Sequence, residues 1–363
     1  MKRLLPAWLG APRLDYALLT ALLVIMLFGL FTLYSASGQD PGMVSRQGLR
    51  LGIGLAVMFL FSQVPPHILR LWTPWLYGVG MLLLLATWWF GVGKGANRWL
   101  DLGVVRFQPS EIMKLAVPMM VAWYLHPRVL PPGWKDSLLA GLVLGLPAVL
   151  IARQPDLGTA LLIAASGGIT LFLAGLRWRV ILALAVSAAA AAPALWLVMK
   201  EYQRDRVRTF LQPEFDPLGQ GWNIIQSKIA VGSGGLTGKG WLNGTQSRLE
   251  FIPERHTDFI LAVISEEFGW LGVTALLLLY LYVIGRGLYI ASQARDTWSR
   301  LVTGSLAMTL FVYVLVNGGM VSGVLPVVGV PLPLISYGGT SAVTLMAGFG
   351  IMMSAWGHRR FVG

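Results

Sequence analysis

Long apolar runs separated by short polar segments make up most of the chain, and this pattern predicts its fold class. Ten of the runs come close to the roughly 20 residues that a helix needs to cross the hydrocarbon core of a bilayer. They cover residues 14–35, 47–61, 69–90, 109–125, 137–151, 158–174, 178–199, 259–285, 301–321 and 338–356. We therefore expect an all-α polytopic membrane protein of about ten transmembrane helices. A single membrane domain over 1–363 is expected, because no tandem repeat or low-complexity linker divides the chain.

One long polar stretch interrupts the pattern between the seventh and eighth apolar runs. Residues 200–258 are the only long water-compatible part of the sequence, so we expect them to form one large loop outside the bilayer. An acidic cluster lies at the end of this stretch, where it leads into the next apolar run: Glu254, Asp258, Glu266 and Glu267. Chemistry that needs water and charge is therefore expected here.

The positive charges of the short loops predict the orientation. An even number of spans places both termini on one side, and Lys and Arg are more frequent in the short loops of that side than in those of the other. Such residues accumulate on the cytoplasmic side. Both termini are therefore predicted to be cytoplasmic and the large loop extracytoplasmic. The first run has no small-residue cleavage site after it, so we expect it to remain as a span.

Composition excludes several classes of protein. With 56% hydrophobic and 12% charged residues over 363 positions, the chain does not fit a soluble globular domain. No nucleic-acid-binding motif accompanies the net charge of +12, so no nucleic-acid partner is expected. The absence of Cys rules out disulfides, zinc thiolates and thiol nucleophiles. The four His are scattered without ligand spacing, so they predict no metal site.

Two charged pairs lie in loops or helix starts on the predicted outer side. Glu111 and Lys114 are three residues apart and would share one face of a helix that starts at Pro109. Ionisable groups at membrane depth usually line a cavity or pair with one another, so this pair is either a binding site or a structural ion pair. Arg153 and Asp156 carry opposite charges in a short outer turn.

Two glycine-rich segments have different expected roles. Residues 317–341 contain three prolines and many glycines within apolar sequence, which a regular helix does not tolerate. Irregular backbone at membrane depth is buried by protein or reached by water, so this segment is expected to wall a cavity. Residues 232–240 resemble a phosphate loop, but Ser233 and Gly240 break the motif around Lys239, and no ATPase is predicted.

Asp258 is the first candidate for a functional residue in the acidic cluster, and a structural alternative stands beside it. Thr257 and Asp258 occupy the place where a helix N-cap belongs, and a capping Asp is a common structural residue. Sequence alone leaves capping and catalysis open, and one residue could do both.

The apolar run after Asp258 is long enough to suggest a gate. As one helix, 258–285 would extend about 42 Å, beyond the ~30 Å hydrocarbon core, so its first turns would stand outside the bilayer. Asp258, Ser265 and Glu266 would then share a face over the cavity. Gly269 or Gly272 could act as a hinge.

Five blocks of sequence occur in order along the chain. They are Gly95-Ala-Asn-Arg-Trp99, Gln108-Pro-Ser-Glu111, Arg153-Gln-Pro-Asp-Leu-Gly-Thr159, Pro253-Glu-Arg-His-Thr-Asp258 and Pro331-Leu-Pro-Leu-Ile-Ser-Tyr-Gly-Gly339. Together they resemble the SEDS family (shape, elongation, division and sporulation), and the likeness covers nearly the whole chain.

The resemblance implies a bacterial inner-membrane peptidoglycan glycosyltransferase whose active side is extracytoplasmic. It would polymerise lipid II onto an undecaprenyl-pyrophosphate-linked glycan strand, in cell-wall elongation and rod-shape maintenance, together with a class B penicillin-binding protein. We expect this partner at the eighth and ninth spans. The family's catalytic aspartate corresponds to Asp258. The substrate-binding candidates are Arg98, Trp99, Gln108, Glu111, Lys114, Arg153, Asp156, Glu254, Arg255, His256, Ser336 and Tyr337.

The residue types suit this chemistry. One carboxylate suffices to take the proton of an attacking hydroxyl, and a departing pyrophosphate needs cations rather than an acid. The cations on the predicted outer side are Arg98, Lys114, Arg153 and Arg255. No cofactor is required, although Asp258 with Glu254 or the pyrophosphate could hold a divalent cation. Two rival functions remain open: a flippase that moves lipid II, and a non-catalytic scaffold that recruits the penicillin-binding protein.

Overall fold

The computed structural model describes residues 14–92, 98–101, 103, 106–199, 201–216, 219–249 and 251–359. Each of the ten predicted apolar runs lies on a helix. These helices are α1 (Tyr16–Ala36), α2 (Pro41–Gln63), α3 (Pro66–Phe90), α4 (Pro109–Leu125), α5 (Trp134–Arg153), α6 (Leu157–Leu173), α7 (Trp178–Val198), α11 (Ile260–Gln293), α12 (Thr297–Val321) and α13 (Thr340–Gly357).

The helical membrane architecture is confirmed, and the number of spans stays a prediction. Among the described residues, six helices are long and apolar enough to cross a membrane: α1, α2, α3, α5, α11 and α12. Helix α6 is apolar but shorter. A small antiparallel sheet, which the all-α prediction did not include, joins α3 to α4 with the order β1 (Gly91–Val92), β2 (Trp99–Asp101), β3 (Arg106–Phe107).

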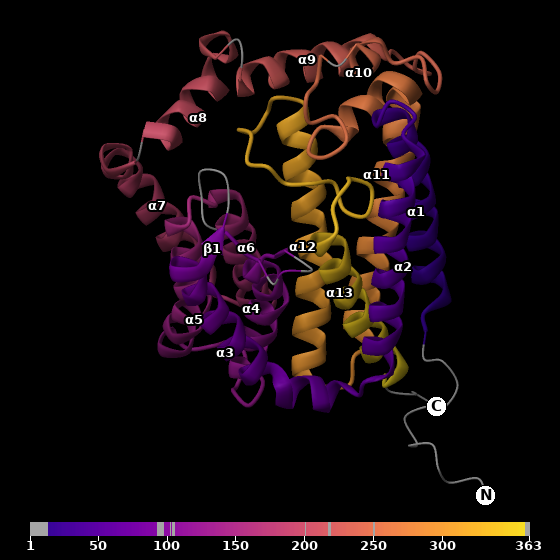
Figure 1. Cartoon of the computed structure of the whole chain (residues 1–363). Coiled ribbons are helices and arrows are strands. Elements are labelled where there is room, and N and C mark those ends of the chain that lie inside the picture. Colours follow the sequence, from indigo (N-terminus) through magenta and orange to yellow (C-terminus); the bar gives the residue numbers. More distant parts are fainter. Residues whose placement is uncertain are drawn as a thin grey trace, which may run out of the picture.

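The polar stretch forms short helices at one end of the molecule. They are α8 (Glu201–Leu211), the 3-10 helix η2 (Pro213–Phe215), α9 (Gln220–Ser233) and α10 (Thr245–Arg248). In Figure 1 these elements lie at the top, whereas α1 begins and α13 ends at the bottom. Helix α9 is fixed to the bundle because Ser227 donates a hydrogen bond of 2.9 Å to the carbonyl of Val321 at the end of α12.

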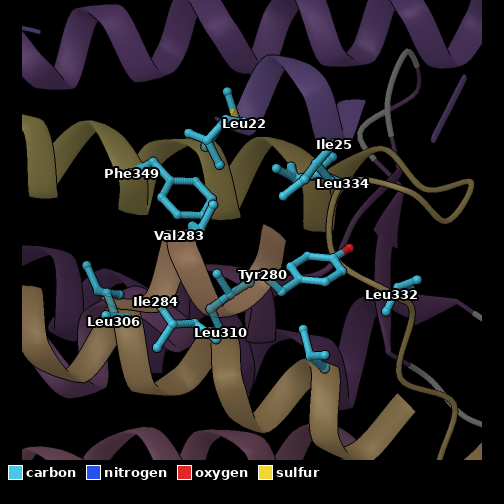
Figure 2. Close-up of a cluster of buried hydrophobic side chains, with 14 of the residues drawn as sticks. Leu22, Ile25, Tyr280, Val283, Ile284, Leu306, Leu310, Leu332, Leu334 and Phe349 are labelled. Carbon is cyan, nitrogen blue, oxygen red and sulfur yellow. The ribbon is translucent and has the colours of Figure 1, made fainter. Parts of the chain in front are cut away.

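The core forms where α1, α11, α12 and α13 meet. Figure 2 shows Leu22 of α1, Val283 of α11, Leu310 of α12 and Phe349 of α13 in one apolar cluster. Tyr280 of α11 is also fully buried there, and its hydroxyl donates a hydrogen bond of 2.6 Å to the carbonyl of Pro333. The core therefore holds the irregular segment between α12 and α13 against the bundle, as expected for a cavity wall.

Helix α11 corrects the prediction of one straight helix from residue 258. It begins at Ile260, and its N-cap Phe259 makes no side-chain capping bond. The helix is broken at Gly269, whose φ of 65° and ψ of −164° are non-helical. The predicted hinge position therefore contains a fixed break, and Asp258 precedes the helix instead of standing on its face.

The glycine-rich segment 232–240 packs against this break. The amides of Trp270 and Leu271 donate to the carbonyls of Gly235 and Leu236 across 2.9 and 3.0 Å, and the amide of Lys239 donates to the carbonyl of Glu266 across 3.0 Å. A Cβ on Gly269 would lie 2.3 Å from the nitrogen of Gly238. The segment thus supplies hydrogen bonds to the backbone around the break, and glycine permits the close approach.

Glu266 also belongs to this packing and not to the surface of a cavity. Its side chain is fully buried and accepts hydrogen bonds from Lys239 Nζ at 2.6 Å and from the amide of Thr245 at 2.8 Å. Ser265 donates to the carbonyl of Leu261 within the helix. The expectation that these two residues share an exposed face with Asp258 is therefore wrong.

Candidate functional site

Asp258 ends the turn that leads into α11, and its backbone is anchored from α12. The fully buried side chain of Asn317 donates hydrogen bonds to the carbonyls of Asp258, at 2.8 Å, and Val330, at 2.7 Å. Gly329, with a left-handed φ of 72°, passes close to the carboxylate, and a Cβ there would lie 3.4 Å from Asp258 Oδ2. The backbone of Asp258 is thus fixed while its carboxylate serves no capping function.

Ser336 and Tyr337 hold the same turn from the segment between α12 and α13. The hydroxyl of Ser336 donates to the carbonyl of Thr257 at 2.6 Å and accepts from the amide of Leu332 at 2.8 Å. The amide of Tyr337 donates to the carbonyl of His256 at 2.8 Å. These contacts assign the backbone of 336–337 and the hydroxyl of Ser336 a positioning role beside Asp258.

The surroundings of Asp258 favour a proton-accepting carboxylate. Burial of its half-buried side chain, assisted by the nearby charge of Glu254, raises its pKa to about 6. Glu254 is itself exposed and accepts a hydrogen bond of 2.6 Å from the hydroxyl of Thr257. A carboxylate with this pKa is mostly ionised at neutral pH and is a stronger base than an ordinary aspartate.

Arg255 and His256 complete the turn. Arg255 Nε donates to the carbonyl of Ala36, at the end of α1, across 2.7 Å. The ring of His256 lies edge-on to that of Tyr337, with 6.1 Å between the centroids, and Arg50 of α2 lies 4.6 Å from the centre of the Tyr337 ring. Helices α1 and α2 therefore help to hold this turn.

A second polar cluster forms where the sheet meets the turn between α5 and α6. Arg98 donates to the carbonyls of Gln154 and Pro155, and its Nη1 lies 3.9 Å from Asp156 Oδ2. Gln108 Nε2 donates to the same carboxylate oxygen at 3.1 Å, while Asp156 also caps α6. The structure therefore brings together three predicted site residues from three motif blocks.

Two further predicted residues of this region make fewer contacts. Trp99, the residue after Arg98, is the first residue of β2 and is half-buried. Arg153 is exposed at the end of α5. The rest of the first motif block, residues 95–97, lies outside the described part of the chain.

Glu111 and Lys114 form a buried ion pair, with 2.7 Å between Lys114 Nζ and Glu111 Oε1. Lys114 Nζ also lies 5.5 Å from the centre of the Tyr313 ring. The pair lines a cavity of about 30 Å³ between α4, α12 and α13. This volume has room for very few water molecules, so the pair stands in a confined space.

The three groups of residues are connected through α12 and the segment after it. Tyr313, beside Lys114, and Asn317, which anchors Asp258, are one turn apart on α12. Gly158, two residues after Asp156, approaches the backbone of Val328 so closely that a Cβ would lie 2.3 Å from the Val328 carbonyl oxygen. Contacts through α12 and the segment after it thus link the neighbourhoods of Lys114, Asp258 and Asp156.

Sequence reasoning missed the residues that fix Asp258 in place. Asn317 and Gly329 both fall within 317–341, the range that the sequence identified as an irregular cavity wall, but their partners are more than 50 residues distant or across a loop. That range begins too early, because α12 continues as a helix through Asn317 to Val321. Gln47 was missed as well, although its side chain donates to the carbonyl of Ser336 at 3.2 Å. Among the residues that the structure describes, no group of three or more His, Asp or Glu is arranged to hold a metal ion.

Comparisons with known proteins agree on one family. The family model named for FtsW, RodA and SpoVE and described as "Cell cycle protein" matches residues 15–360. The chain is 54% identical over 351 residues to the peptidoglycan glycosyltransferase MrdB of Escherichia coli K12, covering 96% of this chain and 95% of that protein. It is 32% identical over 424 residues to the peptidoglycan glycosyltransferase RodA of Treponema pallidum, covering 95% and 98%.

Solved structures give the same result. A chain from a study of polymerization and crosslinking by a peptidoglycan synthase complex superposes with a TM-score of 0.84 and 36% identity, over 98% of this chain and 100% of that one. The crystal structure of the rod shape determining protein RodA from Thermus thermophilus superposes with a TM-score of 0.73 and 30% identity, over 98% and 99%.

Proposed function

Because this chain belongs to the FtsW, RodA and SpoVE family of cell cycle proteins, as its motifs predicted, we propose that it polymerises lipid II with Asp258 as general base. Peptidoglycan glycosyl transfer, the activity of its relatives, is its activity, and it is similar to RodA-like members of the family. It is a multi-pass protein of the inner membrane. Its role is the extension of glycan strands in cell elongation and rod-shape maintenance.

The observation that carries the proposal is the state of the Asp258 carboxylate. It is half-buried, it makes no capping bond, and its pKa of about 6 suits a base at neutral pH. The carboxylate takes the proton of the acceptor 4-hydroxyl as that oxygen attacks the anomeric carbon of the donor. The bond from that carbon to the pyrophosphate oxygen breaks, and the polyprenyl pyrophosphate leaves with the electron pair.

The leaving group needs positive charge. Arg98, whose side chain is 30% exposed, and the exposed Arg153 stand at the turn between α5 and α6. Arg255 lies three residues before Asp258 in the same turn, and its Nε donates to the carbonyl of Ala36. Such cations stabilise the charge that develops on pyrophosphate. Lys114 is less suited, since it is buried in a close pair of 2.7 Å with Glu111, whereas Arg98 lies 3.9 Å from Asp156 and is more exposed. Asp258 and Glu254 are the two carboxylates that could hold a divalent ion with the substrate pyrophosphate, a donor set of the kind Mg²⁺ accepts.

We assign the site to the extracytoplasmic side. The helices of the polar stretch, α8 to α10, lie at the end of the molecule opposite the start of α1 (Figure 1), which supports this orientation together with the loop charges. The termini would then be cytoplasmic.

A class B penicillin-binding protein is the proposed partner, at α11 and α12. Below its break, α11 exposes the apolar side chains of Trp270, Leu278 and Tyr282, whereas α12 is mostly buried and exposes Leu315. These exposed groups give a partner's transmembrane helix more contact surface on α11. The related chain from a peptidoglycan synthase complex supports such an assembly.

The test is polymerisation by the purified protein, alone and with its partner. Fluorescent lipid II in detergent should be converted into long glycan strands, which a gel resolves. Heat-inactivated protein is the control. Transfer of lipid II between the leaflets of a vesicle without any polymer, under both conditions, would support the flippase instead.

A further inference from the structure

An apolar groove between α6 and α12 has no role in the proposed chemistry. It has a volume of about 320 Å³, at the small end of the range for ligand sites. The segment between α12 and α13 lines the groove at its upper end, where Gly158 approaches Val328. The groove is lined by Gly158, Leu161, Leu162, Ala165, Val312, Val316, Leu325, Pro326, Val328 and Val330. Every lining side chain is apolar, so neither a sugar nor a pyrophosphate would fit there without losing its hydrogen bonds to water.

The groove runs along the two helices, which touch beyond its lower end. Leu161 and Ala165 are one turn apart on α6, and Val312 and Val316 are one turn apart on α12. Deeper in the bundle the two helices touch, because Ser305 donates a hydrogen bond of 2.8 Å to the carbonyl of Ser166. An extended apolar chain could therefore enter from the upper end and lie between the helices.

Both polar clusters of the site stand at the upper end of the groove. Val330 lines the groove, and its carbonyl shares the Asn317 side chain with the carbonyl of Asp258. Gly158 also lines it, two residues after Asp156, which lies beside Arg98. A ligand with an apolar chain in the groove would thus place a polar head between a cation and the candidate base.

We propose that this groove binds the first isoprene units of the polyprenyl chain of a lipid-linked substrate, with the pyrophosphate on the side of Arg98. The proposal rests on the proposed function, because only a lipid-linked sugar joins such a chain to the reacting centre. The acyl chains of a bulk phospholipid could contact the same apolar side chains, but a phospholipid has no sugar that the groove would place beside Asp258. The groove therefore sets where the anomeric carbon lies relative to the base.

Photochemical crosslinking tests the occupant. Purified protein in phospholipid nanodiscs would be irradiated with polyprenyl pyrophosphate that carries a diazirine on its second isoprene unit, and the labelled residues identified by mass spectrometry. We expect labels at Leu161, Ala165 or Val316, removed by excess unlabelled undecaprenyl pyrophosphate but not by added phosphatidylglycerol. Equal labelling by a diazirine phospholipid, or labels confined to other helices, would overturn the proposal.

A groove-filling variant gives a second readout. Ala165→Phe should lower the crosslinking yield and raise the KM for lipid II about tenfold, the loss expected when roughly 1.4 kcal/mol of binding is removed. Leu146→Phe, at an exposed apolar position of α5, is the matched control and should change neither. If Ala165→Phe leaves both the KM and the crosslinking yield unchanged, the groove does not bind the polyprenyl chain. Polymerisation by the wild type with no label in the groove would overturn this inference alone, whereas a wild type that makes no polymer removes the proposed function.

Discussion

The side-chain amide of Asn317 donates a hydrogen bond of 2.8 Å to the main-chain carbonyl of Asp258. The same amide nitrogen donates to Val330, so one buried side chain ties α12, the turn before α11 and the cavity wall together. The carboxylate of Asp258 is left out of these bonds and remains available for chemistry.

Replacing Asn317 should therefore damage both stability and activity. Asn317→Leu leaves two carbonyls without this donor, at a cost of about 1–3 kcal/mol for each buried group that stays unpaired. We expect a lower melting temperature and a lower polymerisation rate. Ser322→Ala, at an exposed helix end of α12, is the control. If Asn317→Leu melts like the wild type and polymerises at the normal rate, the anchor is dispensable.

The pH dependence should follow the raised pKa of Asp258. A general base must be unprotonated, so the polymerisation rate should fall as the pH drops through about 6. An ordinary aspartate would lose activity only near pH 4. Initial rates between pH 4.5 and 8, at saturating lipid II, provide the measurement. A rate that stays constant down to pH 4.5 contradicts the raised pKa.

The same shift has a consequence for stability. Since the folded pKa lies above the unfolded value of 3.8, the folded state binds the proton more tightly in the window from about 4 to 6, and stability falls as the pH rises through it. Asp258→Asn removes the charge that burial disfavours. Its melting temperature at pH 7.5 should therefore equal or exceed that of the wild type. A much lower value would indicate that the carboxylate has a structural role.

We predict that the main role of the Glu111–Lys114 ion pair is to stabilise the fold. Breaking a buried pair strands one charge, at a cost of about 3–5 kcal/mol, so Glu111→Gln and Lys114→Met should each lower the melting temperature and the activity. The double variant should recover part of the lost stability, because neither charge is then stranded. Unchanged melting of both single variants would show that the pair is solvated.

The break in α11 provides a test with a matched control. Gly269→Ala forces a left-handed φ on alanine and drives its Cβ to 2.3 Å from the nitrogen of Gly238, so it should destabilise the protein by at least about 1–3 kcal/mol. Gly285→Ala, in the same helix with open space around it, should be neutral or slightly stabilising. The melting temperatures of the two variants provide the measurement. Equal melting temperatures would show that the break at Gly269 does not require glycine.

Sequence reasoning predicted the elements that depend on local pattern. Apolar runs of sufficient length predicted ten of the described helices, α1 to α7 and α11 to α13, and the spacing of Glu111 and Lys114 predicted their ion pair. It failed where distant segments decide the outcome. Helix α11 appeared continuous because Gly269 is only mildly unfavourable in a helix, and the segment 232–240 that bonds to the break lies some 30 residues earlier. The sequence around Glu266 does not predict its burial beside Lys239, and the sequence around Asn317 does not predict its hydrogen bond to Asp258.

The most direct test of Asp258 as the base is glycan synthesis by Asp258→Asn beside the wild type. Purified proteins of equal melting behaviour would receive labelled lipid II with the partner present, and strand formation would be followed over time. Asn keeps the size and the hydrogen-bonding oxygen of Asp but takes up no proton at the relevant pH, so we predict a loss of about 10²-fold or more in rate. Wild-type strand synthesis by Asp258→Asn would contradict the account.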